Sequence, residues 1–462
     1  MQELNLGYHY PIIYWNTACL IINAGANEEL DDNKSTQYGK IAKAIANFKQ
    51  RSIIVDRPLI NEAKFSFVPD EKNNRIIFSF KGLCGIGDDI ARAIVEHQPY
   101  SSFEDFCKRM VDTKIIGTAK MIILIKAGCF NELDSPDRME TMKKFLSRNV
   151  FTPTDKLTMQ QFNSALEYDI FPKEMETMIR IKNFKAYALH ESFFLKNIID
   201  EGKKVPKKGY HDRYFALDER GTEFLMEHFN TCIVGTKEDG VIISEKLFNK
   251  EWDAFIQPLK DYMALPETLQ LYNQKKLDST MESYASGSLE QWDMESLSYY
   301  PDRHELWNLN EPKYGVVDYN SLPEIPEVYD YTTRRVRGEI KHFPKYKIFR
   351  LAGTVLDSDN NKHLVTLLTN HSVVTCKYNK GQYSYYNKRI SEQTPAGKKK
   401  VLEESWFKRG SKIIVCGYRR EDQFVVTKYA DTVYTHTTNR IEEIYNDGTI
   451  LAQTDRKKVG EE

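Results

Sequence analysis

The beginning of the chain has apolar residues spaced as in helices. Two series recur at helical intervals: Ile12, Ile13, Trp15, Cys19 and Ile22, and then Ile41, Ile45 and Phe48. Asn16 and Thr17 interrupt the first series, which is shorter than the roughly 20 apolar residues that a membrane span needs. We interpret it as a buried helix. Residues 75–80 (Arg-Ile-Ile-Phe-Ser-Phe) are apolar and extended in character, and they predict a strand or an extended segment.

A glycine-rich turn follows and leads into a helix. The turn is Phe80-Lys81-Gly82-Leu83-Cys84-Gly85-Ile86-Gly87-Asp88-Asp89, and Ile90, Ile94 and Val95 continue it at helical spacing. Backbone N–H groups at a helix start are unpaired and lie at the positive end of the helix dipole, where a phosphate oxygen binds. The pattern is typical of a helix-hairpin-helix, which contacts the nucleic-acid backbone without reading bases. A plain loop has the same glycine spacing, so the motif is weak in isolation.

Further helices follow this turn. Ser101-Ser102-Phe103-Glu104 matches a capping box that starts a helix through Met110, Thr118 starts another, and Gly128 ends it. Residues 136–310 are less regular. We predict helices around 136–148, 172–188 and 251–263, and short strands at 232–234 and 240–243. The prolines between Pro301 and Pro326 indicate a linker.

From Lys347 the hydrophobic period changes to two, which is typical of strands. Five short strands are predicted at 348–355, 363–369, 373–378, 412–418 and 423–426. The long loop between the third and the fourth favours a small barrel, and we expect an OB-fold. Asp357 and Asp359 lie where the first strand turns, so turn geometry explains them better than a metal site does. The predicted fold class is therefore α+β, with helices and tandem hairpins first, a mixed middle region and a C-terminal barrel.

Charge and cysteines narrow the functional classes. The chain has 462 residues, 28% of them charged, and a formal net charge of −1. The segment from Lys377 to Arg420 nevertheless carries twelve Lys and Arg against three Glu, a local excess of nine positive charges, which indicates one basic face. The seven cysteines are scattered without metal-binding spacing, and no secretion signal is recognisable, so we expect a cytoplasmic protein with reduced thiols and without a membrane segment.

Four segments, taken in order, resemble the C-terminal half of the bacterial replicative (C-family) DNA polymerase III alpha subunit. They are His9-Tyr10-Pro11 with Arg57-Pro58-Leu59-Ile60-Asn61; the turn from Phe80 to Gly87; Phe103-Glu104-Asp105-Phe106 with Lys126-Ala127-Gly128-Cys129-Phe130-Asn131; and Glu295-Ser296-Leu297-Ser298-Tyr299-Tyr300 with His304. The resemblance covers residues 1–135 and 285–430. It departs from the family at Gly7 and Cys84, where the family usually has basic residues.

The resemblance implies a division of labour. In this family the catalytic carboxylates that hold Mg²⁺ lie in the palm, which precedes the fingers, and this chain begins within the fingers-like part. We therefore expect no catalytic or metal residues here, and a palm-containing chain as partner, as in a split polymerase. The N-terminal apolar stripe then either forms that interface or packs within this chain. A sliding clamp is a further partner of the family, but Gln291-Trp292-Asp293-Met294-Glu295-Ser296 lacks the final aromatic residue of its binding peptide.

The expected DNA contacts fall into two groups. Duplex DNA is expected at the first hairpin, on Lys81, Gly85, Ile86, Gly87 and Asp88. Residues 126–130 either brace that hairpin or contact DNA themselves. Single-stranded DNA is expected on the barrel, where aromatic and basic side chains alternate. The expected set is Tyr378, Tyr383, Tyr385, Lys388, Arg389, Lys408, Arg409, Arg419 and Arg420, with Phe407 and Tyr418 in the core and Lys398-Lys399-Lys400 in a solvated loop.

The expected division of the chain has six parts. Residues 1–65 are fingers-like, 66–135 form the tandem helix-hairpin-helix, 136–310 connect, 311–340 link, 341–435 form the OB-fold and 436–462 are a charged tail. Two functions fit this order. The first is the DNA-binding portion of a replicative polymerase, and the alternative is a stand-alone, non-catalytic DNA-binding protein derived from one.

Overall fold

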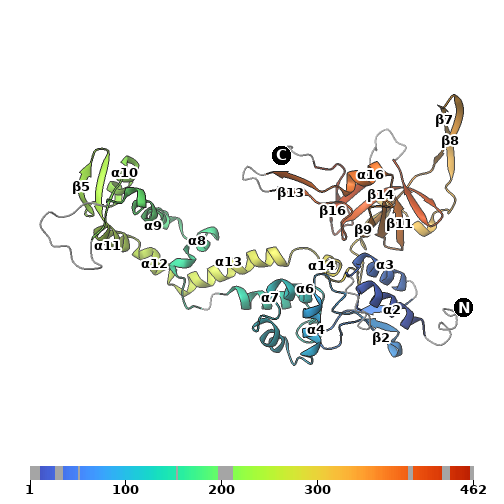
Figure 1. The fold of residues 1–462 in the computed structure, drawn as a ribbon, viewed down its shortest axis with the longest axis horizontal. Coiled ribbons are helices and arrows are strands. Elements are labelled where there is room, and N and C mark those ends of the chain that lie inside the picture. The colour runs from blue at the N-terminus through green and yellow to red at the C-terminus, as the bar shows by residue number, and fades with distance from the viewer. Residues whose placement is uncertain are drawn as a thin grey trace. The chain divides into compact units, whose positions relative to one another are not determined.

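The computed structural model describes residues 11–26, 35–49, 52–151, 154–195, 212–393, 399–428 and 437–457. The chain divides into two compact units, drawn in Figure 1. Unit 1 consists of Met1–Met142 and Ser286–Glu462, and unit 2 consists of Lys143–Ala285. Among the described residues, no helix has the length and apolarity that crossing a bilayer requires.

Unit 1 begins with helices α2 (Ile12–Ala24) and α3 (Tyr38–Lys49). His9 and Tyr10 lie outside the described residues. The predicted helix at Ile12 forms, but the prediction that its apolar series is buried holds only for Ile13, which is 2% exposed. Ile12 and Ile22 are 54% and 66% exposed, whereas Thr17 is buried. Thr17 tolerates burial because its hydroxyl donates to the carbonyl of Ile13 at 2.8 Å, so its polar group is satisfied within the helix.

A small sheet and a helical cluster follow. The sheet has the order β1-β3-β2, with β1 and β3 parallel. An aromatic core formed by Tyr100, Phe103, Phe106 and Phe130 holds the helices together. The predicted helix start is confirmed to within one residue: Ser102, one residue after the Ser101 of the Ser-x-x-Glu pattern, is the N-cap, and its hydroxyl accepts the N–H of Asp105 at 3.1 Å. The elements are β1 (Ile54–Asp56), β2 (Val68–Asp70), β3 (Arg75–Ile77), α4 (Asp88–Glu96), α5 (Phe103–Phe106) continued by a π-helical turn (Cys107–Val111), α6 (Thr118–Lys126) and α7 (Arg138–Val150).

The C-terminal part of unit 1 is a closed five-stranded barrel. Its strands follow the order β9-β10-β11-β15-β14, and β14 pairs with β9 to close it. Helix α16 lies between the third and the fourth strand. All five predicted strands are confirmed, because alternate apolar residues fill the barrel core. The elements are β9 (Phe349–Asp359), β10 (Leu364–Leu368), β11 (Val373–Lys377), α16 (Lys380–Asn387), β14 (Lys412–Arg420) and β15 (Gln423–Val426).

Two segments differ from the sequence-based expectation. Residues 311–340 are not a plain linker, since Tyr319 and Leu322 lie in the barrel core and β7 (Val328–Val336) pairs with β8 (Glu339–Tyr346). Residues 437–457 are not a charged tail either. There, β16 (Thr438–Ile444) and β17 (Ile450–Gln453) extend the sheet beyond β14, and the buried Arg456 donates to Glu403 at 2.6 Å. A further two-stranded antiparallel sheet is formed by β12 (Ile390–Gln393) and β13 (Lys399–Glu403). The short helices α14 (Leu289–Leu297) and α15 (Glu311–Tyr314) also belong to unit 1.

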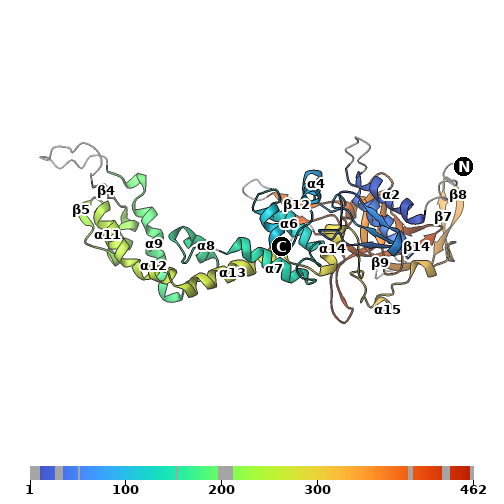
Figure 2. The same cartoon turned by 90° about the horizontal axis from the view of Figure 1, so that it is seen from below.

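Unit 2 combines helices with a three-stranded sheet in the order β4-β6-β5 (Figure 2). One hydrophobic core lies against this sheet, and a second lies among the helices, including residues Phe162 and Tyr272. The predicted helices and strands of the middle region are present. The elements are α8 (Phe162–Glu167), α9 (Glu176–Ala188), β4 (Tyr214–Ala216), α10 (Glu219–His228), β5 (Ile233–Lys237), β6 (Gly240–Ser244), α11 (Glu245–Phe255), α12 (Gln257–Met263) and α13 (Pro266–Tyr284).

Candidate nucleic-acid interface

The first hairpin has the backbone that its glycines allow. Gly85 has a φ of +84°, and a Cβ there would lie 3.1 Å from Cδ1 of Ile123. Gly87 caps α4 in an extended conformation, with φ −80° and ψ 164°, and the space beside it is open. The hairpin therefore presents exposed backbone at the start of a helix, as the sequence predicts.

Its electrostatics differ from the prediction. Lys81 forms an ion pair with Asp88, and Asp89 adds a second carboxylate to the first turn of α4. The N–H of Ile86 donates to the carbonyl of Leu83 at 3.3 Å. The charge of Lys81 is thus already neutralised, and the N–H of Ile86 already has an acceptor. Neither group is available for the phosphate contact that the sequence predicts. The carboxylates also repel a phosphate at this helix start.

A second hairpin, residues 112–117, repeats this geometry; it contains Asp112, but the helix that follows it has no acidic residue in its first turn. Gly117 caps α6 with φ −83° and ψ 165°, nearly the values of Gly87. A Cβ at Gly117 would also meet no atom within 4 Å. The first turn of α6 has no acidic residue, and Lys114 beside it is exposed. Lys120 donates to the carbonyl of Gly85 at 2.6 Å and so joins the two hairpins. The sequence analysis missed Gly117, although Ile116-Gly117 repeats Ile86-Gly87 before a helix.

Residues 126–130 brace the hairpins through a buried ion cluster. The Asp293 carboxylate accepts hydrogen bonds from the two terminal guanidinium nitrogens of Arg57, at 2.6 and 2.9 Å, and from the Arg138 guanidinium at 2.5 Å. The two arginines also donate to the carbonyls of Ala127 and Lys126, at 3.2 and 2.5 Å. Burial opposes the charge of Arg57, but the carboxylates of Asp293 and Asp302 outweigh it, so its pKa is raised. The bracing role is therefore built from side chains far apart in the sequence.

The barrel separates the predicted single-strand contacts into core and surface. Tyr378 and Tyr383 are 2% and 3% exposed and belong to the hydrophobic core, so they cannot stack on a base. Their positions correct the prediction: Tyr378 directly follows β11 and Tyr383 lies on α16, and both side chains pack into the barrel core. Phe407 is buried as expected, whereas Tyr418 is only half-buried and packs on Tyr346, with 4.5 Å between ring centroids.

The predicted cations divide in the same way. Arg409 donates to Sγ of Cys84 at 3.1 Å and lies over the Tyr38 ring, where it joins the barrel to the first hairpin. Arg419 pairs with Glu324 and Arg389 with Glu404, both at 3.0 Å. Arg420 lies over the rings of Tyr346 and Tyr418, 5.6 Å from each centroid. Among the described residues, the exposed members of the predicted set whose side-chain polar groups have no partner are Tyr385, Lys388 and Lys408. Lys399 and Lys400 lie in β13, and Lys398 lies outside the described residues.

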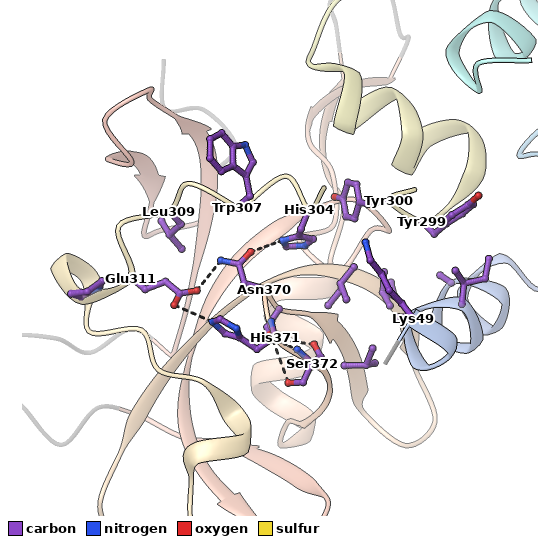
Figure 3. A pocket seen from close by; sticks show the side chains of 18 residues that line it. Lys49, Tyr299, Tyr300, His304, Trp307, Leu309, Glu311, Asn370, His371 and Ser372 are labelled. Atoms are coloured by element: carbon purple, nitrogen blue, oxygen red, sulfur yellow. Dashed lines mark hydrogen bonds and ion pairs between the residues drawn. The ribbon is translucent and has the colours of Figure 1, made fainter. Parts of the chain in front are cut away.

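A cavity of about 610 Å³ lies between α3, the segment after α14 and the turn between β10 and β11 (Figure 3). Within it, His304 bonds to Oδ1 of Asn370 at 3.0 Å, and Asn370 donates to Glu311 at 2.8 Å. Burial lowers the pKa of His304 to about 4, so its ring is neutral at pH 7. The sequence analysis did not find this cavity, because its walls come from four separate segments, including Leu356 of β9.

Of the Asp357 and Asp359 pair, only Asp359 has the predicted turn role, because Asp357 lies within β9 opposite Thr366. Asp359 accepts the N–H groups of Asn361 and Lys362, both at 2.9 Å. In the part of the chain that the structure describes, no group of three or more His, Cys, Asp or Glu side chains is placed to hold a metal ion.

Paired glycine-capped hairpins define the class of the N-terminal domain. Residues 52–140 match the protein family described as "Helix-hairpin-helix motif", so the chain contains this motif together with a closed five-stranded barrel. The chain is 40% identical over 470 residues to the Bacillus subtilis (strain 168) protein named "Probable DNA polymerase YorL". It is equally similar to the Bacillus phage SPbeta protein named "DNA-directed DNA polymerase". Each alignment covers 99% of this chain and 34% of the relative, so the chain spans about a third of the length of the relatives it matches.

Proposed function

We propose that this chain is the DNA-binding portion of a DNA polymerase of the bacterial replicative, C-family type. The observation that carries this proposal is the 40% identity across 99% of the chain to two proteins named as DNA polymerases. The helix-hairpin-helix motif at residues 52–140 supports it independently. In this proposal the chain holds DNA, and nucleotidyl transfer takes place outside it.

The two hairpins contact the backbone of duplex product. The open, extended backbone at Gly87 and Gly117 supports this role, since phosphate oxygens can approach both helix starts. The α6 start is the stronger contact, because its first turn has no carboxylate and Lys114 lies beside it. Such contacts are independent of sequence, as a moving polymerase requires.

The barrel is an OB-fold that binds the template single strand. The strand order β9-β10-β11-β15-β14, with α16 after the third strand, supports this assignment. We place the contact on Tyr385, Lys388 and Lys408, which are exposed. A stacked base contributes about 1–3 kcal/mol in such sites.

The palm and its Mg²⁺ belong to the remainder of the polymerase or to a partner chain. Two-metal transfer needs clustered carboxylates around the triphosphate. We assign the exposed apolar side chains of α2, among them Ile12, Trp15 and Ile22, to the surface that packs on the palm-containing part. The place of action is then the bacterial cytoplasm, where the DNA is, and a sliding clamp is a further candidate partner.

Primer extension tests the proposal. The purified chain is mixed with primed template, dNTPs and Mg²⁺, with and without a palm-containing polymerase fragment. We expect no extension by the chain alone and extension when the fragment is added. A Trp15→Ser, Ile22→Ser variant is expected to lower this complementation while binding DNA normally. Extension by the chain alone would contradict the proposal.

The alternative is a stand-alone, non-catalytic DNA-binding protein, and the same experiment separates the two. If the chain binds DNA but no palm-containing fragment associates with it or is activated by it, the alternative is favoured. Single-strand binding is tested with Tyr385→Ala, Lys388→Ala, Lys408→Ala. We expect roughly 10- to 100-fold weaker binding to a single strand, from the loss of one stacking and two charge contacts, with duplex binding retained.

A further inference from the structure

The segment between α15 and the barrel forms a long exposed β-ribbon, residues 328–346. Among the strands that the structure describes, β7 and β8 pair only with each other, in a two-stranded sheet. Nearly every residue of the ribbon is exposed, and Figure 1 shows it extending beyond the barrel strands. A nine-residue strand spans about 30 Å. Isolated two-stranded hairpins are marginally stable in water, so a ribbon of this length needs a reason to persist.

The outer half of the ribbon is strongly basic. Arg334, Arg335, Arg337 and Lys341 lie within eight residues, accompanied by one acid, Glu339. Arg334 lies directly opposite Lys341 in the pairing register, so two like charges share one face. Like charges in this position destabilise a sheet. Among the described residues, the three arginines have no ion-pair or hydrogen-bond partner for their guanidinium groups, which leaves this charge for an external anion.

The turn at the tip of the ribbon also places a positive charge where an external anion can reach it. Arg337 and Gly338 form the two-residue turn, with φ values of +53° and +86°. Such a turn favours Asn, Asp or Gly at its first position, because these residues adopt the left-handed conformation at least cost. An arginine here accepts backbone strain and places a cation at the outermost point of the ribbon.

The base of the ribbon is fixed to the barrel. The ring of Tyr346 packs on Tyr418, and the Arg420 guanidinium donates to the Tyr346 hydroxyl at 3.2 Å. Lys345 pairs with Asp330 at 2.6 Å and Lys341 with Glu339 at 3.8 Å, whereas the three arginines near the tip have no such partner among the described residues. The ribbon is thus attached to the barrel at its base and carries its unpaired arginines at the other end.

We propose that the β7–β8 ribbon binds duplex DNA, with its arginines on the phosphates that flank a groove. The major groove, about 12 Å wide, admits a two-stranded ribbon. A polyanion complements the uncompensated charge, and exposed Tyr331 and Phe343 supply contact area along the sugars. This inference rests on the proposed function and adds a third DNA contact to the hairpins and the barrel.

The test is the salt dependence of DNA binding by the full chain. The probes are a fluorescein-labelled 25-base-pair duplex and the corresponding single strand. For Arg334→Ala, Arg335→Ala, Arg337→Ala we expect about tenfold weaker duplex binding at 150 mM NaCl. We also expect the slope of log K against log [NaCl] to shrink by about two to three, since each phosphate contact contributes roughly 0.9. Single-strand binding is expected to stay unchanged.

Three further variants keep the result interpretable. The triple Arg→Lys variant retains the charge and is expected to keep most of the slope. Lys237→Ala, Lys246→Ala, Lys250→Ala removes three exposed charges from unit 2 and is expected to bind like the wild type. Arg337→Gly relieves the strain at the tip, so weaker duplex binding by this variant cannot be attributed to misfolding.

The outcomes separate the ribbon from the proposed function. If the wild type binds duplex and the triple Ala variant matches it in affinity and slope, the ribbon proposal is overturned while the proposed function stands. The ribbon proposal is also overturned if the triple Ala variant loses as much affinity for the single strand as for the duplex. It is overturned as well if that variant binds duplex normally but no longer associates with the palm-containing fragment. If the wild type binds no duplex, the proposed function fails first.

Discussion

Asp293 holds the hairpin domain together through its ion pairs. Its carboxylate is 4% exposed and is shared by the buried side chains of Arg57 and Arg138. Removing this anion leaves the buried guanidinium group of Arg138 without a counter-charge and leaves Arg57 paired only with the exposed Asp302, which costs more than the net value of the ion pairs.

Asp293→Asn is therefore expected to lower the free energy of unfolding by about 3–5 kcal/mol. The measurement is equilibrium unfolding in urea at pH 7. Glu295→Gln is the matched control, because Glu295 is 48% exposed and pairs with Lys126, and it is expected to cost under about 1 kcal/mol. Equal effects of the two changes would contradict the assigned role of the cluster.

His304 is expected to make stability depend on pH. Its pKa of about 4 in the fold, lowered mainly by burial, is below its ordinary value of 6.5, so the unfolded chain takes up the proton first. The contribution of His304 is full above about pH 6.5 and is lost as the pH falls toward 4. Between pH 7 and pH 5 this amounts to about 2 kcal/mol.

The comparison that isolates this effect uses His304→Gln. This variant should lose about 2 kcal/mol less than the wild type between pH 7 and pH 5. His342→Gln, at an exposed histidine of the ribbon, should behave like the wild type. A pH dependence identical in all three proteins would show that His304 titrates normally.

At the scale of elements, the two hairpins have the same backbone and opposite charge. Gly87 and Gly117 cap their helices with φ and ψ values that agree within a few degrees. Two carboxylates begin α4, and none begins α6. The helix dipole and the carboxylates therefore oppose each other at the first hairpin, and the second hairpin is the more favourable place for phosphate.

Gly117→Asp is expected to weaken duplex binding about tenfold, since it puts a negative charge where phosphate approaches. The fold should tolerate the change, because Asp is a good N-cap and the space at Gly117 is open. Gly117→Asn keeps the cap without the charge and should bind nearly as the wild type does. Fluorescence anisotropy with a labelled duplex measures both, and the melting temperature checks folding. Normal duplex binding by Gly117→Asp would remove α6 from the interface.

At the scale of the whole molecule, the two units have separate cores. The hydrophobic clusters of unit 2 draw only on residues between Leu157 and Tyr272, and the barrel cluster draws only on unit 1. Chains of this kind unfold in more than one step.

Differential scanning calorimetry of the full chain is therefore expected to show two transitions. Asp293→Asn should move one of them down by roughly 10 °C and leave the other in place. Phe248→Ala, in the core of unit 2, should move only the second. One transition that moves as a whole with either change would mean that the units unfold together.

The sequence by itself determined the elements. Alternating apolar residues located all five barrel strands, and helical spacing with Ser102 and Gly128 as signals located the helices of the hairpin domain. These features are local, because periodicity and capping act over a few residues. Glycine spacing likewise predicted the first hairpin, and it held the signal for Gly117 as well.

Only the tertiary structure decided which side chains are available to DNA. Tyr378 and Tyr383 are aromatic residues of the kind that stack on bases, but their side chains lie in the barrel core. The charge of Lys81 is neutralised by its ion pair with Asp88. Asp293 and Arg57 are 236 residues apart in sequence and meet only in the fold. Burial and ion pairing depend on what the rest of the chain places beside a residue, and that information is not contained in local pattern.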